Sequence, residues 1–344
     1  MKTTRIVFGI GLLVLGGTVL LDSCRKKDFV PRNPINFQVP SGFPSPTYNF
    51  AGNPLSEEGF QLGKKLFFDG RLSKDDMHSC GSCHQPVAAF TTFEHDRSHG
   101  FGNSHTLRNA PGLFNMAWYP YFRQDGSAQT IEEVSLAHIQ AQDEMAETMP
   151  SIINKLKGDA QYRTMFAAAF GDQAVTQDRI IKALSQYVVS LVSANSKWDK
   201  VQRGEATFTT QELNGQAVFQ AKCNSCHSGA LQTDFSFRNT GLAVDPALND
   251  VGRMRVTGNR ADSLKFRVLS LRNIDYTSYY GHDGRFNMFR AMVQHYRFGV
   301  NPSSTLDPLL ANRIQMTNAE ENDLVAFLRT LNDPEFLNNP RFRE

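Results

Sequence analysis

Cys80-Gly81-Ser82-Cys83-His84 is repeated as Cys223-Asn224-Ser225-Cys226-His227 in a chain of 344 residues. In a Cys-x-x-Cys-His pattern, two thiols one helical turn apart reach the two vinyl groups of one porphyrin, and the adjacent imidazole points at the iron. A zinc site would need further Cys or His residues at matching spacing, and a thioredoxin-like redox pair would not occur twice with the same His. The repeat therefore predicts two covalent c-type haems, one in each half.

The two halves also echo each other outside these motifs. Each haem motif follows a Gly-x-x-apolar-Phe block and precedes a Leu-Arg-Asn block and an Asp-Gly pair. These blocks are Gly63–Phe67, Leu107–Asn109 and Asp125-Gly126 in the first half and Gly215–Phe219, Leu271–Asn273 and Asp283-Gly284 in the second. The echo predicts a duplicated cytochrome c module.

Helical signals dominate the rest of the sequence. Thr176 is an expected N-cap for a helix over about 177–192, and Thr317 or Asn318 for a C-terminal helix whose apolar residues share one face. Such a C-terminal helix usually packs across the haem-bearing helix in cytochrome c folds. We therefore expect a mostly α protein with two cytochrome c-like domains, residues 56–200 and 205–344, each with one covalent haem. The polar stretch Ser193–Thr210 is the expected crossover between them.

The N-terminus reads as an export signal. Lys2 and Arg5 precede an apolar run from Ile6 to Leu21, which is shorter than the roughly 20 apolar residues of a membrane span. The run ends in Leu21-Asp22-Ser23-Cys24, which resembles a bacterial lipobox. We predict a lipoprotein signal peptide over 1–23, lipidation of Cys24 and a proline-rich tether over 24–55. A plain signal peptide and an uncleaved anchor are the alternatives, and all three readings export the chain.

Composition and net charge limit the kinds of partner that the protein can bind. The hydrophobic fraction is 40%, as in a globular protein with a core, and the formal net charge is only +2. Lys and Arg are spread along the chain, which gives no case for nucleic acid. We expect a periplasmic or outer-membrane-anchored lipoprotein that meets the membrane through its lipid alone.

Taken together, the blocks over about residues 56–335 resemble those of the bacterial di-haem cytochrome c peroxidase family, including its MauG-like branch. The resemblance rests on their order and spacing: Gly63–Asp69, Arg71–Ser73, Cys80–His84, Arg108–Pro111, Asp125-Gly126, Asn195–Trp198, Cys223–His227, Ser270–Asn273 and His282–Gly284. It implies an N-terminal peroxidatic haem on His84 and a C-terminal electron-transfer haem on His227. It also implies that hydrogen peroxide binds at the first iron.

The same resemblance implies further site residues. Glu144 matches the glutamate that the family uses as the acid–base group at the peroxide. The second axial ligand of the C-terminal haem is a Met in typical peroxidases and a Tyr in the MauG-like branch, and the matching position is Tyr296, with Met292 and His295 as competitors. Asn109 matches a ligand of the family's interdomain calcium, but Leu269 replaces a neighbouring proline, so calcium stays an open prediction.

Three residues depart from the family pattern at the first haem. Gln124 stands where the family has a tryptophan between the haems, Val134 replaces a distal glutamine, and His138 replaces a nearby proline. His138 is therefore a candidate ligand or proton donor, with a surface position on a helix as the alternative. Trp118, Tyr119 and Tyr121 are candidates for the aromatic bridge between the haems. His95, His99 and His105 are candidates for a loop histidine that binds the first iron in the resting state and so blocks access of peroxide.

We expect an enzyme that reduces hydrogen peroxide with electrons from a small cytochrome or copper protein. The alternatives are a MauG-like oxidase acting on a partner protein or small molecule, and a non-enzymatic electron carrier with both irons closed. Family members often form homodimers, which the resemblance leaves open for this chain.

Overall fold

The computed structural model describes residues 33–344, and the predicted signal peptide and Cys24 lie outside this range. Helices dominate the described residues, as expected. The strands in this range are two-residue segments that pair as two antiparallel ladders: β1 (His99–Gly100) with β2 (Ser104–His105), and β3 (Phe237–Arg238) with β4 (Phe266–Arg267). Among the described helices, none is long and apolar enough to cross a membrane.

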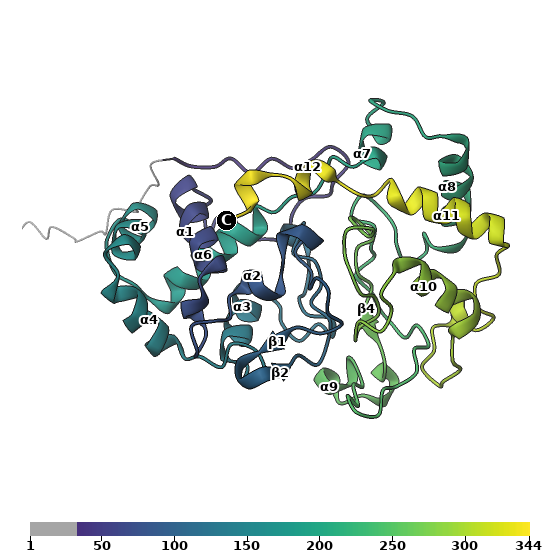
Figure 1. The fold of residues 1–344 in the computed structure, drawn as a ribbon. Helices are drawn as coiled ribbons and strands as arrows, with labels where there is room; N and C mark the ends of the chain where they lie inside the picture. Colours follow the sequence, from purple (N-terminus) through teal and green to yellow (C-terminus); the bar gives the residue numbers. More distant parts are fainter. Residues whose placement is uncertain (1–32) are drawn as a thin grey trace, which may run out of the picture. The chain divides into compact units, whose positions relative to one another are not determined.

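The N-terminal core forms where helix α1 (Glu57–Phe68) crosses helix α6 (Gln177–Val189) (Figure 1). A Cβ built on Gly63 would lie 1.9 Å from the carbonyl oxygen of Ala183, so only glycine permits this approach. Further helices of this half are α2 (Cys80–Cys83), α3 (Ile131–Gln140), α4 (Met149–Gly158) and α5 (Ala160–Phe170).

The C-terminal core repeats this crossing with helices α8 (Thr210–Lys222) and α11 (Asn318–Arg329). Here a Cβ on Gly215 would lie 1.9 Å from the carbonyl oxygen of Asp323. Because α8 leads directly into Cys223, the C-terminal helix does pack across the haem-motif helix, as predicted. Shorter helices of this half are α9 (Met254–Thr257), α10 (Phe289–Gln294), a π-helical turn (His295–Gly299) and α12 (Pro334–Leu337).

The predicted helix starts agree with the structure. The Thr176 hydroxyl accepts a hydrogen bond from the backbone N–H of Arg179, and Thr317 forms a capping box with Glu320. Helix α6 ends at Val189, three residues before the expected end, because the chain then turns into the loop that Asn115 holds. The remaining described helical turns are 3-10: Gly70–Leu72, Pro86–Ala88, Phe101–Asn103, Met116–Trp118, Arg260–Asp262, Pro308–Leu310 and Pro340–Phe342.

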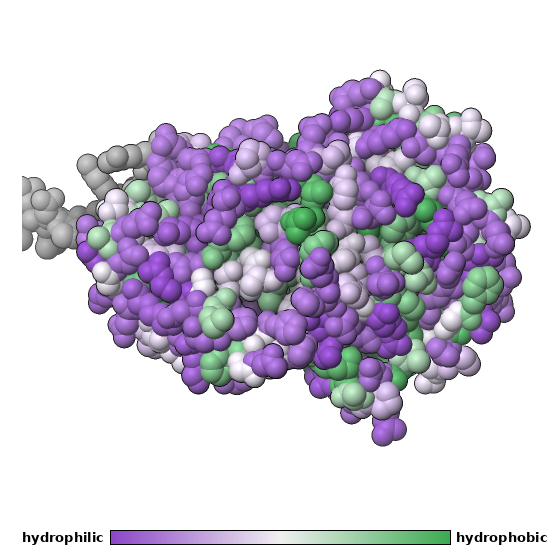
Figure 2. All heavy atoms as spheres, viewed as in Figure 1, coloured by the Kyte–Doolittle hydropathy of each residue, from purple (hydrophilic) through white to green (hydrophobic). Residues whose placement is uncertain are grey.

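The segment between the halves is more ordered than a polar crossover. It contains helix α7 (Lys197–Gln202), whose Asp199 forms a buried ion pair with Arg272 at 2.7 Å. The chain end also returns to the first half, since Phe336 and Phe342 belong to the N-terminal core and the Tyr187 hydroxyl donates to the Phe342 carbonyl. The chain therefore cannot be divided at a single point into two segments that each form one core. The face of the molecule drawn in Figure 2 is largely hydrophilic over both halves.

Candidate functional site

The first haem motif folds as one helical turn. The Ser79 hydroxyl caps α2 by accepting a hydrogen bond from the backbone N–H of Ser82. His84 follows this turn, and its Nδ1 lies 2.9 Å from the carbonyl oxygen of Phe90, which orients the ring as in a metal-ligating histidine. Burial lowers the pKa of His84 to about 4, so the ring is neutral at neutral pH, as an iron ligand must be.

The second haem motif repeats this arrangement at the end of α8. Nδ1 of His227 lies 3.3 Å from the carbonyl oxygen of Gln232, and burial lowers the pKa of His227 to about 4. The four motif cysteines are free thiols, and burial raises the pKa of Cys80 and of Cys223 to about 12 each. Both motifs thus present two thiols and one oriented neutral imidazole, the donor set of a c-type haem.

A cavity of about 240 Å³ lies in front of the second motif. Cys223 and His227 line it from one side, while Pro111 and Tyr119 contribute from the first half of the chain. Two polar atoms in buried positions of its wall, Arg267 Nη1 and His282 Nδ1, have no hydrogen-bond partner among the described residues.

A haem would fit both the motif residues that line this cavity and the two polar atoms in its wall that lack a hydrogen-bond partner. Burial lowers the pKa of Arg267, which shows a buried guanidinium without a matching anion, and a haem carries two propionates. Sequence reasoning gave Arg267 no role. Its only signal is a basic residue inside an apolar strand segment, Phe266-Arg267-Val268.

The structure distinguishes the candidate ligands of the second iron by whether their side chains line the cavity. Tyr296 and Met292 both line the cavity. His295 is engaged elsewhere, because its Nε2 lies 2.8 Å from the carbonyl oxygen of Thr240. The π-helical turn at His295–Gly299 sets which of these side chains point into the cavity. Burial raises the pKa of Tyr296, so its phenol is protonated at neutral pH when no metal is bound.

Glu144 and His138 lie near His84 of the first motif. His138 occupies the last turn of α3, Glu144 lies in the turn that follows, and the Nδ1 of His138 contacts the Glu144 carboxylate. Burial alone would raise the pKa of Glu144, but the charge and hydrogen bond of His138, with Arg123 and His84 nearby, hold it below its ordinary value. An ionised carboxylate therefore faces the neighbourhood of His84.

The remaining departures from the family pattern are structural. Val134 packs against the N-terminal core, and Gln124 is buried, with its Nε2 donating to the Asn109 carbonyl at 2.8 Å. The three candidate bridges also differ. The Trp118 Nε1–H donates to the Pro44 carbonyl, Tyr121 packs on Phe237, and Tyr119 lines the cavity beneath the Arg267 guanidinium, 4.6 Å from ring centre to cation.

The candidate loop histidines form an exposed cluster. His99 and His105 face each other across the β1–β2 ladder, with ring centres 4.4 Å apart, and the ring of His95 lies 4.9 Å from that of His99. Cys83 Sγ lies 3.8 Å from the His99 carbonyl, so the ladder adjoins the first motif. Nothing in the described residues brings one of these rings to His84, and their ligand role stays a prediction.

Asn109 connects the two halves through hydrogen bonds. Its backbone N–H donates to the His282 carbonyl, and its side-chain N–H donates to the Asp96 carbonyl at 2.9 Å. Within residues 33–344 no cluster of three acidic, His or Cys side chains could hold a metal ion. A calcium site built from Asn109 and carbonyl oxygens stays a prediction.

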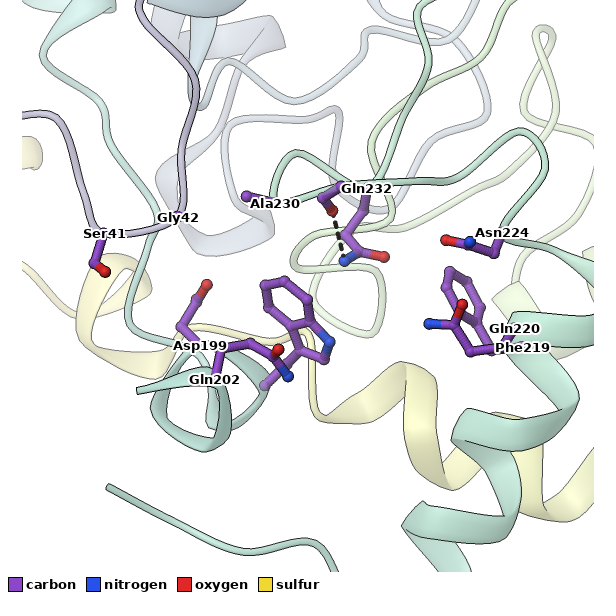
Figure 3. Close-up of a pocket in the computed structure, with 11 residues that line it drawn as sticks. Ser41, Gly42, Asp199, Gln202, Phe219, Gln220, Asn224, Ala230 and Gln232 are labelled. Carbon is purple, nitrogen blue, oxygen red and sulfur yellow. Dashed lines mark hydrogen bonds between the residues drawn. The ribbon is translucent and has the colours of Figure 1, made fainter. Parts of the chain in front are cut away.

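A second, smaller cavity of about 230 Å³ lies behind the second motif (Figure 3). Gln232 reaches into its rim, with its side-chain N–H bonded to the Gly229 carbonyl, while its backbone carbonyl holds His227. Ser41 and Gly42 of the proline-rich N-terminal stretch also line it. The residues that line this cavity therefore support the second motif.

Comparison with known proteins shows the family of the chain. The di-haem cytochrome c peroxidase family profile matches residues 57–207. The methylamine utilization protein MauG of Methylophilus methylotrophus is 30% identical over 327 residues, which cover 93% of this chain and 94% of that protein. The cytochrome c551 peroxidase of Nitrosomonas europaea is 33% identical over 300 residues, which cover 83% and 84%.

A solved structure agrees with these relatives. The crystal structure of a MauG-like protein associated with microbial copper homeostasis is 32% identical, covers 90% of this chain and 99% of its own, and superposes with a TM-score of 0.83. The chain therefore belongs to the di-haem cytochrome c peroxidase family, a family of oxidoreductases with haem c cofactors.

Proposed function

We propose that this protein reduces hydrogen peroxide to water with electrons from a small redox protein, such as a cytochrome or a copper protein. The electrons pass through the C-terminal haem to the N-terminal haem. The observation that carries this proposal is the half-buried Glu144 carboxylate near His84, in contact with His138, which holds its pKa below the ordinary value. Peroxide cleavage needs such a base near the open face of the iron.

The residues of the first site have three different roles: haem attachment, iron binding and proton transfer. Cys80 and Cys83 would hold the haem covalently, and His84, neutral and oriented by the Phe90 carbonyl, would bind its iron. The haem supplies the redox centre that binds peroxide. Glu144 accepts a proton from the bound peroxide, so that the oxygen–oxygen bond can break toward the protonated oxygen.

The residues of the second site serve electron transfer. Cys223 and Cys226 would attach the second haem, and His227 would bind its iron. Arg267 and His282 would face its propionates, because both carry a buried polar atom in need of a partner. Tyr296 would be the second protein ligand of that iron, since it lines the cavity while His295 is bonded to the Thr240 carbonyl.

Glu144→Gln tests the proposal directly. The variant keeps the size of the side chain but removes the base, so turnover of peroxide with a reduced cytochrome c donor should fall by roughly 100-fold or more. Asp143→Asn is the matched control, because the neighbouring Asp143 side chain is exposed. Unchanged turnover in Glu144→Gln, with both haems retained, would remove Glu144 from the mechanism.

The second candidate is a MauG-like oxidase that modifies a partner protein or a small molecule. Tyr296, which lines the cavity, favours it, because a phenolate ligand stabilises higher oxidation states of iron. Gln124 favours it too, because it stands where the family has a tryptophan and offers no aromatic ring for electron transfer between the haems. Tyr296→Met should change the paramagnetic resonance spectrum of the second haem and raise its reduction potential. Tyr280→Phe is the control, since the Tyr280 hydroxyl is already bonded to the Ile274 carbonyl. An unchanged spectrum in Tyr296→Met would end this candidate.

Several further features belong to the same proposal. We propose export as a lipoprotein through Cys24, two haem-bearing domains over 56–200 and 205–344, and a calcium ion at Asn109. Mass spectrometry of the mature protein would test the lipid and the two covalent haems, and metal analysis would test calcium. If peroxide leaves the haem spectra unchanged in every redox state, the protein is an electron carrier and no peroxidase.

A further inference from the structure

His138 is built into the first site more firmly than a surface histidine would be. Helix α3, which carries it, starts at a capping box between Thr130 and Glu133 and closes with the Ala141 N–H bonded to the Ala137 carbonyl. The Glu144 N–H is bonded to the Ala141 carbonyl, and its own carbonyl accepts from the Phe101 N–H at 2.7 Å. The contact between the two side chains is therefore fixed by backbone at both ends.

A carboxylate and the C-terminal end of a helix lie beside the His138 ring. His138 lies in the last turn of α3, where the helix dipole stabilises a cation, and its Nδ1 contacts the Glu144 carboxylate. The other titratable groups whose charge acts on Glu144 are Arg123, the half-buried His84, and the thiols of Cys80 and Cys83. With Nδ1 engaged by the Glu144 carboxylate, proton exchange with a substrate falls to the other ring nitrogen of His138.

We propose that His138 and Glu144 form one proton-transfer pair, in which His138 is the acid that protonates the leaving oxygen of peroxide. This inference rests on the proposed peroxidase function. Glu144 alone would have to take a proton from one oxygen and carry it to the other. With His138 beside it, the two steps fall to two groups that already share a hydrogen bond.

The reaction balances with these two groups. Glu144 takes the proton of the peroxide oxygen that stays in the site. As the oxygen–oxygen bond breaks, the departing hydroxide receives a proton from His138 and leaves as water. Reduction of the second oxygen atom to water would use the proton on Glu144, one proton from solvent and two electrons from the donor protein, which the two haems would carry. Solvent reprotonates His138, so two protons and two electrons yield two waters.

His138→Leu tests the pair by rapid mixing of the ferric di-haem protein with hydrogen peroxide at pH 4.5 to 8. We expect the reaction to slow by roughly 10- to 100-fold because the acid is lost. Its acid limb should also move to higher pH. Without the His138 charge, burial raises the pKa of Glu144, and the carboxylate is lost earlier as the pH falls.

A spectroscopic readout separates this role from iron ligation. Paramagnetic resonance of ferric His138→Leu should match that of the unaltered protein, because the acid does not bind iron. His138→Gln keeps a hydrogen bond to Glu144 and should slow the reaction while shifting the acid limb less. His78→Leu is the control, since His78 forms a similar contact with Asp75 at 3.1 Å outside the site.

The outcomes are distinct. A reaction in His138→Leu with the rate and pH profile of the unaltered protein would overturn the role of His138 and leave the peroxidase intact. Conversion of a low-spin haem to high spin in that variant would show that His138 is an iron ligand, which also overturns the proposal. A native protein that does not react with peroxide would instead defeat the proposed function itself.

Discussion

The two halves of the molecule hold their motif histidines alike and differ in what lies opposite them. His84 and His227 each point Nδ1 at a backbone carbonyl a few residues downstream, and burial lowers the pKa of each to about 4. Glu144 and His138 stand near the first, whereas Tyr296 and Met292 line the cavity of the second. The support of the cofactor is therefore duplicated, and the reactive face has diverged.

Each half also contributes a matched arginine that ties it to other parts of the chain. Arg272 forms an ion pair with Asp199 of α7, with both side chains buried, and Arg108 forms ion pairs with Asp125 and with Asp250 of the other half. Both arginines come from the repeated Leu-Arg-Asn blocks. The halves are thus held together by the same residue of the repeat, used twice.

The largest effect on stability should come from breaking the more buried of these pairs. Asp199→Ala leaves the Arg272 guanidinium, which is fully buried, without its partner, and should cost about 3–5 kcal/mol of unfolding free energy. Denaturant unfolding of the di-haem protein would measure it. Asp250→Ala should cost less, because Arg108 keeps Asp125 and is partly exposed. An equal or larger loss in Asp250→Ala would contradict the difference between the halves.

The two helix crossings should respond alike to a single methyl group. Gly63→Ala and Gly215→Ala each place a Cβ 1.9 Å from a backbone oxygen of the crossing helix, so each should destabilise the protein by roughly 1–3 kcal/mol. Gly158→Ala is the control, since a Cβ there meets open space and the substitution should be neutral or slightly stabilising. Thermal unfolding would show it, and tolerance of alanine at one crossing only would break the structural repeat.

Acid should weaken the two ion pairs between the halves, and the loss of unfolding free energy should be smaller than in the variants above. Burial raises the pKa of Asp199 and Asp250, but Arg272 and Arg108 outweigh it, and both pKa values end below the ordinary aspartate value. A depressed pKa contributes stability above the unfolded-state value that is lost as the pH falls through the folded-state value. The unfolding free energy should therefore decline below about pH 4. Asp199→Asn should flatten this decline, and an equally steep decline in that variant would exclude Asp199 as a cause.

The sequence predicted those features that depend on local pattern. The haem motifs, the helix caps at Thr176 and Thr317, and the repeated glycines are short-range signals with one physical reading each. The contact of His138 with Glu144 follows from the turn after α3, which the spacing of six residues alone does not define. The unpartnered Arg267 arises from packing between segments far apart in sequence, and periodicity carries no information on it.

The choice among candidate ligands shows the same limit. Tyr296, Met292 and His295 lie within five residues of one another, and sequence could not separate them. A π-helical turn changes the register after α10, so that His295 turns to the Thr240 carbonyl while Tyr296 stays in the cavity. Such a turn has no sequence signature of its own, because it depends on how the helix end packs.

The most direct test of the account is paramagnetic resonance of the ferric di-haem protein before and after hydrogen peroxide, with Tyr296→Met used to assign the signal of the C-terminal haem. The account predicts that the N-terminal haem, beside Glu144 and His138, reacts first and that Glu144→Gln suppresses its change. A first response at the C-terminal haem, or an equal response of both haems in Glu144→Gln, would contradict it.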